Sequence, residues 1–108
     1  MSNFEFTDSE TWGGLPVVRK VSEIEPRMRL VVTGLVVSSG TQHVGESLSA
    51  RYTIDDGTGQ IDLLFLGQPS VGGLSEGAFV TVEGTVMSDN TRNVIWNPMY
   101  RIEPAIDY

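Results

Sequence analysis

Residues 30–36 read LVVTGLV and residues 80–86 read VTVEGTV. In both stretches an apolar residue recurs at every second position, and the third of these positions is a glycine, Gly34 or Gly84. Such alternation predicts strands with one buried face. A glycine on that face removes a side chain where a strand bends sharply or approaches its neighbour, and closed barrels need such corners. Two matching corners therefore predict two bent strands, over residues 30–39 and 79–87, that close one barrel.

Three further stretches complete the pattern of five strands. Residues 48–55 and 60–66 alternate between apolar and polar side chains, and the DDGTG sequence at residues 55–59 predicts a tight connection between them. Residues 93–102 form the fifth strand, interrupted at Asn97-Pro98 because proline has no amide hydrogen to donate. The expected inward residues of the second and third strands are Leu48, Ala50, Tyr52, Ile54, Ile61, Leu63 and Phe65. The predicted fold class is all-β, a five-stranded barrel with at most short helical turns.

The length of 108 residues suits a single domain. Residues 1–14, MSNFEFTDSETWGG, are acidic, end in two glycines and have no periodic apolar pattern. We interpret them as a flexible N-terminal arm, or alternatively as an arm whose aromatic residues dock on the domain or on a partner. Residues 15–108 form the predicted domain.

Charge and composition restrict the function. The net charge is −7, and outside the arm eleven acidic residues still face seven basic ones. A protein that binds nucleic acid through phosphates normally has a basic surface, so strong phosphate binding is not predicted. No apolar stretch is long enough to span a membrane, the first eight residues do not resemble a secretory leader, and cysteine is absent. We therefore expect a cytoplasmic protein with no membrane partner.

The strands carry a family resemblance. The sequence VVTGLVV at residues 31–37 is followed by YTIDDGTGQIDLLF at 52–65, GGLSEGAFVTVEGTV at 72–86 and VIWNPMY at 94–100. In this order they resemble the OB-fold nucleic-acid-binding domains, most of all the small stand-alone bacterial and actinobacterial OB proteins. The chain is also similar to the wedge domain of RecG-type helicases and to the OB domains of replication protein A. This resemblance implies an OB barrel that binds single-stranded nucleic acid.

No group of residues predicts catalysis. Asp55 and Asp56 are adjacent, so on a strand they point to opposite faces, and a turn in which an Asp accepts backbone hydrogen bonds explains them. His43, the single histidine, lies in a loop without an identifiable nucleophile or orienting acid. The phosphate-binding GxxxxGK[ST] loop is absent from the sequence. We predict a binding module, with no catalytic residue, no metal site and no cofactor.

The expected binding face is the outward side of the second and third strands, together with the loops after the first and fourth strands. Arginines would contact phosphates, and exposed aromatic rings would stack on bases. Trp96 has an alternative position inside the barrel with Val94, and the expected bulge at Pro98 leaves the orientation of Tyr100 open. The candidate nucleic-acid-binding residues are Arg29, Arg51, Arg92, Trp96 and Tyr100.

The same alternation places aliphatic side chains outward. Leu35, Val37, Leu64 and Leu66 would form a contiguous apolar patch, and such patches mark interfaces. The alternative function is therefore a protein-interaction or oligomerisation module, in which the N-terminal arm, another copy or a different protein covers the patch. A third hypothesis joins the two functions and places the acidic, aromatic arm in the nucleic-acid groove.

Overall fold

A computed structural model describes residues 17–89 and 92–104, and the predicted arm lies outside these ranges. Strands dominate the described residues, and the one helical element among them is a single 3-10 turn. The elements are β1 (Val17–Val18), η2 (Val21–Glu23), β2 (Arg29–Val44), β3 (Ser47–Asp55), β4 (Gln60–Phe65), β5 (Phe79–Asp89), β6 (Arg92–Trp96) and β7 (Met99–Ile102).

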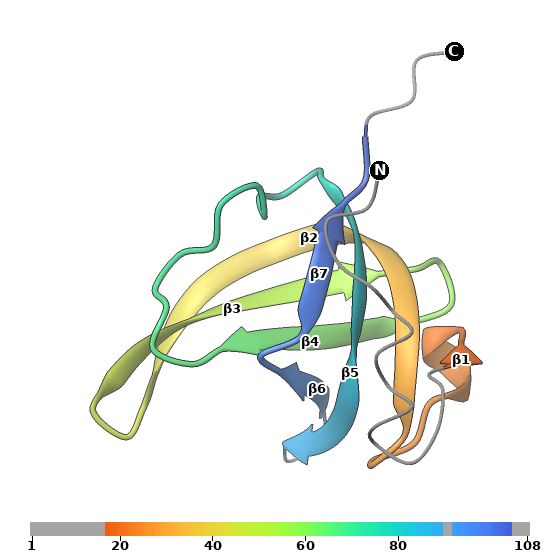
Figure 1. The fold of residues 1–108 in the computed structure, drawn as a ribbon, viewed down its shortest axis with the longest axis horizontal. Coiled ribbons are helices and arrows are strands. Elements are labelled where there is room, and N and C mark those ends of the chain that lie inside the picture. Colours follow the sequence, from red (N-terminus) through yellow and green to blue (C-terminus); the bar gives the residue numbers. More distant parts are fainter. Residues whose placement is uncertain (1–16, 90–91, 105–108) are drawn as a thin grey trace.

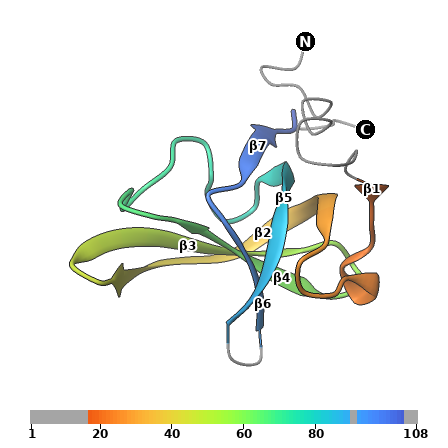
Figure 2. The ribbon, with the colours of Figure 1, turned by 60° about the horizontal axis from the view of Figure 1, so that its bottom comes forward.

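Five of the strands form a closed ring. β2 pairs antiparallel with β3, and β3 pairs antiparallel with β4. β4 then pairs in parallel with β6, and β6 pairs antiparallel with β5, which returns to β2. The ring surrounds the interior in Figures 1 and 2, while the β2–β3 hairpin extends beyond it. This connectivity is that of the five-stranded Greek-key OB barrel, so the predicted fold class is confirmed.

Alternation along the strands fills the barrel. Of the seven predicted inward residues, six are buried, and Leu48 is the exception because it lies near the exposed end of the hairpin. The rings of Tyr52 and Phe65 meet edge to face, with their centroids 5.9 Å apart. The remaining core comes mainly from the inward residues of the two bent strands, which are Leu30, Val32, Val36, Val80, Val82 and Val86.

Both predicted corners are places of close approach. β2 changes partner at Leu35, which lies opposite Phe79 on one edge and opposite Asp55 on the other. A Cβ atom on neighbouring Gly34 would lie 3.0 Å from the backbone oxygen of Asp55. A Cβ atom on Gly84 would lie only 2.4 Å from Cγ2 of Ile95. Glycine at these positions therefore allows the ring to close.

The predicted interruption of the last strand is also confirmed, since β6 and β7 follow one another along the same edge of β5. Asn97 lies between them with a φ of 50°. Its backbone N–H donates to the carbonyl of Leu64 at 2.7 Å, and its side-chain oxygen accepts the N–H of Leu66 at 2.9 Å. The break is thus held by hydrogen bonds to β4 and to the residue just after it.

The turn at residues 55–59 binds its own backbone, as predicted. Asp55 accepts the N–H of Gly57 at 2.7 Å, and Asp56 accepts that of Thr58 at 2.8 Å. Asp56 also accepts the N–H of Val21 at 2.8 Å and so ties η2 to the barrel. Partial burial raises the pKa of Asp56, but the Thr58 hydroxyl and backbone groups of Val21, Thr58 and Gly59 outweigh burial and lower that pKa below its usual value.

Replacing Gly84 by alanine should destabilise the barrel by about 2 kcal/mol, because Cγ2 of Ile95 sits on a branched carbon and cannot rotate freely out of the way. Urea unfolding measures the change. The matched control is Gly40→Ala on β2, where no atom lies within 4 Å of the added carbon and stability should stay within about 0.5 kcal/mol. Equal stability of the two variants would contradict this role of Gly84.

Candidate functional site

The outward face of β3, β4, β6 and β5 carries the candidate site. The ladder places Arg51 opposite Leu64, and Leu64 opposite Trp96. The neighbouring row consists of Thr53, Asp62, Val94 and Met87, each opposite the next. These residues alternate with core residues along their strands, so their side chains share the outward face. The β2–β3 hairpin and the paired ends of β5 and β6 flank this surface.

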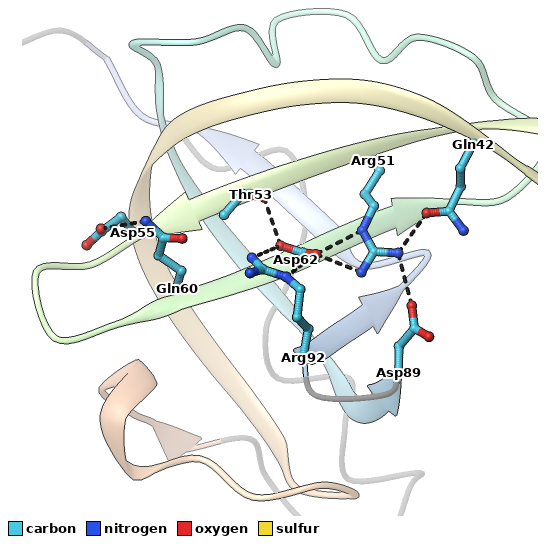
Figure 3. Close-up of polar contacts among 8 residues, drawn as sticks. All are labelled: Gln42, Arg51, Thr53, Asp55, Gln60, Asp62, Asp89 and Arg92. Carbon is cyan, nitrogen blue, oxygen red and sulfur yellow. Dashed lines mark hydrogen bonds and ion pairs between the residues drawn. The ribbon is translucent and has the colours of Figure 1, made fainter.

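Asp62 is the centre of the site (Figure 3). Its side chain is only 3% exposed, although it lies on the outside of the barrel. Arg92 donates to both carboxylate oxygens, from Nε at 2.8 Å and from Nη2 at 2.6 Å. Arg51 donates from Nε at 2.8 Å and forms an ion pair through Nη2 at 2.7 Å, and Thr53 donates its hydroxyl at 2.8 Å. A buried carboxylate is stable here because charged donors surround it.

These contacts keep Asp62 ionised. Burial by itself raises the pKa of this carboxyl group, but hydrogen bonds from Arg92, Thr53 and Arg51 outweigh burial and lower the pKa below its usual value. The hydrogen bond and the charge of Asp62 raise the pKa of Arg92 in return. Asp62 therefore fixes both guanidinium groups throughout the physiological pH range.

The guanidinium nitrogen of Arg51 that does not contact Asp62 has two other partners. This nitrogen, Nη1, donates to Oε1 of Gln42 at 2.7 Å and to Oδ2 of Asp89 at 3.1 Å. Arg51 itself is 20% exposed, whereas Arg92 is 47% exposed. Two arginines and two aspartates make up the cluster, so its formal charge is zero. The site offers guanidinium donors without a net positive field.

Exposed apolar side chains lie on the same outward face as the charged cluster. Trp96 is 48% exposed, and Met87 is exposed on the neighbouring strand, opposite Val94. Val94, two residues earlier on β6, lies on the same outward face as Trp96 but is buried. Because Trp96 lies on this face and is exposed, its alternative position inside the barrel is wrong. An exposed indole on the same face as the fixed arginines provides a surface that a planar ring can stack on.

The five predicted binding residues do not all meet. Arg51, Arg92 and Trp96 share the outward face described above. Arg29 lies in the β2–β5 ladder, where it donates to the buried carboxylate of Glu83 at 2.8 Å. Tyr100 packs against the core, and its ring meets that of Phe65 edge to face at 5.7 Å. The nucleic-acid contacts predicted for the five residues stay predictions. The ring of Tyr100 packs against the core, so it does not form one stacking surface together with Trp96.

The predicted aliphatic patch is not contiguous. β3 lies between β2 and β4, so Leu35 and Val37 do not adjoin Leu64 and Leu66. Leu64 is also only 2% exposed, while Leu66 is half-buried. The expectation of one surface patch was wrong because it treated these two strands as neighbours. Contact of these residues with a protein stays a prediction.

Several residues of the site were missed as functional residues by the sequence reasoning. Alternation placed Asp62 outward, and a single acid between aliphatic residues of a strand was a signal that a cation covers it. Met87 and Asp89 gave no local signal, because they reach the site only through the pairing of distant strands. Gln42 is nine residues from Arg51, on the other strand of the β2–β3 hairpin, and a single glutamine there gave no signal of function. In the two described ranges no cluster of side chains suited to a metal ion is present. The same ranges contain no helix that is long and apolar enough to cross a membrane.

No family model matches the chain, and no curated protein matches it. Solved structures do match. The second OB-fold domain of replication protein A from Methanococcus maripaludis is 17% identical with a TM-score of 0.61, and the match covers 84% of this chain and all of that one. The replication factor A related protein from Methanobacterium thermoautotrophicum is 16% identical with a TM-score of 0.65, over 85% of this chain and 96% of that one.

A structure of RecG bound to a three-way DNA junction is 21% identical, with a TM-score of 0.65 over 82% of this chain but only 13% of the RecG chain. These likenesses confirm that the chain has the OB fold. They also confirm, at the level of fold, the predicted similarity to replication protein A domains and to RecG. The predicted bacterial origin stays a prediction.

Replacing Asp62 by asparagine should lower the free energy of unfolding by about 2 kcal/mol at pH 7. This is less than the 3–5 kcal/mol typical of a fully buried pair, because both arginines reach water. A lowered carboxyl pKa stabilises the fold above the unfolded pKa of about 3.9, and this contribution is lost as the pH falls through the folded value. The difference between the two proteins should therefore shrink below about pH 4.

Urea unfolding between pH 7 and pH 3 measures this difference. Glu25→Gln is the matched control, because Glu25 is an exposed acid near η2 and its loss should change stability by less than about 0.5 kcal/mol. A difference between wild type and Asp62→Asn that stays constant down to pH 3 would argue against an ionised Asp62.

Proposed function

We propose that this chain is a non-catalytic OB module that binds single-stranded nucleic acid through the outward face of β3, β4 and β6. The observation that carries the proposal is the exposed ring of Trp96 on the same face as two arginines fixed by buried Asp62. OB barrels in general bind oligonucleotides on the face of their second and third strands and with the loops after the first and fourth strands. The structural likeness to replication protein A domains and to RecG bound to a DNA junction supports a nucleic-acid ligand.

Each side chain has a proposed role. Trp96 stacks on one unpaired base, and the thioether of Met87 extends the apolar surface beside the ring. Arg92 contacts a phosphate, because it is the more exposed arginine and no hydrogen bond or ion pair to a described residue occupies its Nη1. Asp62 touches no ligand and positions the two guanidinium groups.

The charge of the site determines how binding depends on salt. Each phosphate that a protein neutralises on a single strand changes the slope of log K against log salt by about −0.7. With Arg51 and Arg92 balanced by Asp62 and Asp89, we expect few net phosphate contacts and a shallow slope. Stacking then supplies most of the affinity, which is weak for the chain alone.

Replacing Trp96 by alanine should weaken binding to a fluorescein-labelled single-stranded oligonucleotide by about 1–3 kcal/mol, the contribution of one stacked base. Fluorescence anisotropy at low salt measures the affinity. Phe79→Ala is the matched control, because Phe79 is an exposed aromatic residue on β5 next to Leu35, away from the Asp62 cluster, and its loss should leave binding unchanged. Absence of binding by the wild-type chain at low salt would overturn the proposed function.

A protein-interaction or oligomerisation module is the second candidate. The observation that favours it is the pair of Phe79 and Leu35, which lie opposite each other on β5 and β2, with Phe79 exposed. Exposed Val37 follows on β2. If two copies associate through this surface, Phe79→Glu should turn a dimer into a monomer in light scattering, while Trp96→Ala should leave the mass unchanged. A wild-type chain that is monomeric at high concentration excludes this self-association.

A further inference from the structure

The two carboxylates that contact Arg51 differ in their surroundings. Asp62 is buried and engages Nε and Nη2. Asp89 is 41% exposed and contacts Nη1 alone, at 3.1 Å. It lies at the end of β5, opposite Arg92 in the β5–β6 ladder. An exposed single contact is weak, so water or another anion can replace Asp89 without disturbing the buried contact with Asp62.

Nη1 of Arg51 is a good position for a phosphate oxygen. It belongs to a guanidinium group that Asp62 holds in a fixed orientation, and charge-assisted hydrogen bonds to phosphate have the same geometry as those to a carboxylate. Arg92 bonds to the same carboxylate as Arg51. The two guanidinium groups therefore lie on opposite sides of one carboxylate (Figure 3), an arrangement that suits neighbouring phosphates of one strand.

We propose that Arg51 is a second phosphate-binding position, which the carboxylate of Asp89 fills in the free protein. This inference rests on the proposed function and adds a ligand position to it. A strand that binds with its base on Trp96 and a phosphate on Arg92 displaces Asp89 from Nη1 to engage Arg51. Asp89 therefore lowers the affinity for nucleic acid and selects against anions that cannot also stack on the indole ring.

The test compares wild type with Asp89→Asn, which removes the competing charge but keeps the size of the side chain. The variant should bind the labelled single-stranded oligonucleotide about three- to fivefold more tightly at moderate salt, the range expected for breaking an exposed ion pair. The slope of log K against log salt should become steeper by about 0.7, because in the wild-type protein the displaced carboxylate of Asp89 takes up a cation, which offsets one counterion released from the strand. Fluorescence anisotropy over a range of salt concentrations gives both values.

Two further variants separate this mechanism from a general effect of charge. Glu25→Gln removes one negative charge from an exposed site near η2 and should change neither affinity nor slope. In an Arg51→Gln background, confirmed as folded by circular dichroism, Asp89→Asn should no longer tighten binding. An equal gain in the Glu25 variant, or a gain that persists without Arg51, overturns the inference.

The result also distinguishes this inference from the proposed function. A wild-type chain that binds, together with an Asp89→Asn variant of equal affinity and slope, overturns the second phosphate position alone. Absence of binding by both chains at low salt overturns the proposed function and the inference with it.

Discussion

Closure of the barrel between β4 and β6 is the constraint on which both the core and the site depend. Only this parallel pairing brings Arg92, from the end of the chain, to Asp62 in the middle. The pairing requires β5 to bend so that β6 fits beside β4, and the contact of Gly84 with Ile95 leaves no room for a side chain at the bend. A glycine in the interior thus determines where an arginine lies on the surface.

The outward face is unusual because its centre is buried. Leu64 and Val94 lie outward but are hidden from water, and buried Asp62 lies opposite Val94 and two residues before Leu64 on β4. The long stems of Arg51 and Arg92 reach this carboxylate from both sides, and arginine stems cover apolar surface while the charged ends meet water. The two arginines therefore cover the buried centre of the outward face. Their ion pairs with Asp62 also hold the guanidinium groups in one orientation in the free protein.

Alternation predicted much of the fold because it depends on local spacing alone. It placed Ile61, Leu63 and Phe65 inside, and it located both glycine corners. It failed where the answer depended on which strands are neighbours. The aliphatic patch was assigned to β2 and β4 without β3 between them, and Asp89 was not connected with Arg51, thirty-eight residues away in sequence. Side-chain pairing across a barrel is a property of register, which no single strand encodes.

The acidic charge of the chain is compatible with the proposed nucleic-acid ligand, because the charged residues at the candidate site balance one another. A net charge of −7 opposes long-range attraction of a polyanion, so electrostatic steering cannot be the source of affinity. The candidate site is instead locally neutral, since two aspartates balance two arginines, and an exposed indole lies on the same face. In the proposed function, such a surface would favour ligands that combine a flat ring with a single anionic group at short range. An unpaired nucleotide has both features, whereas the regular phosphate backbone of a duplex presents charge without an accessible ring.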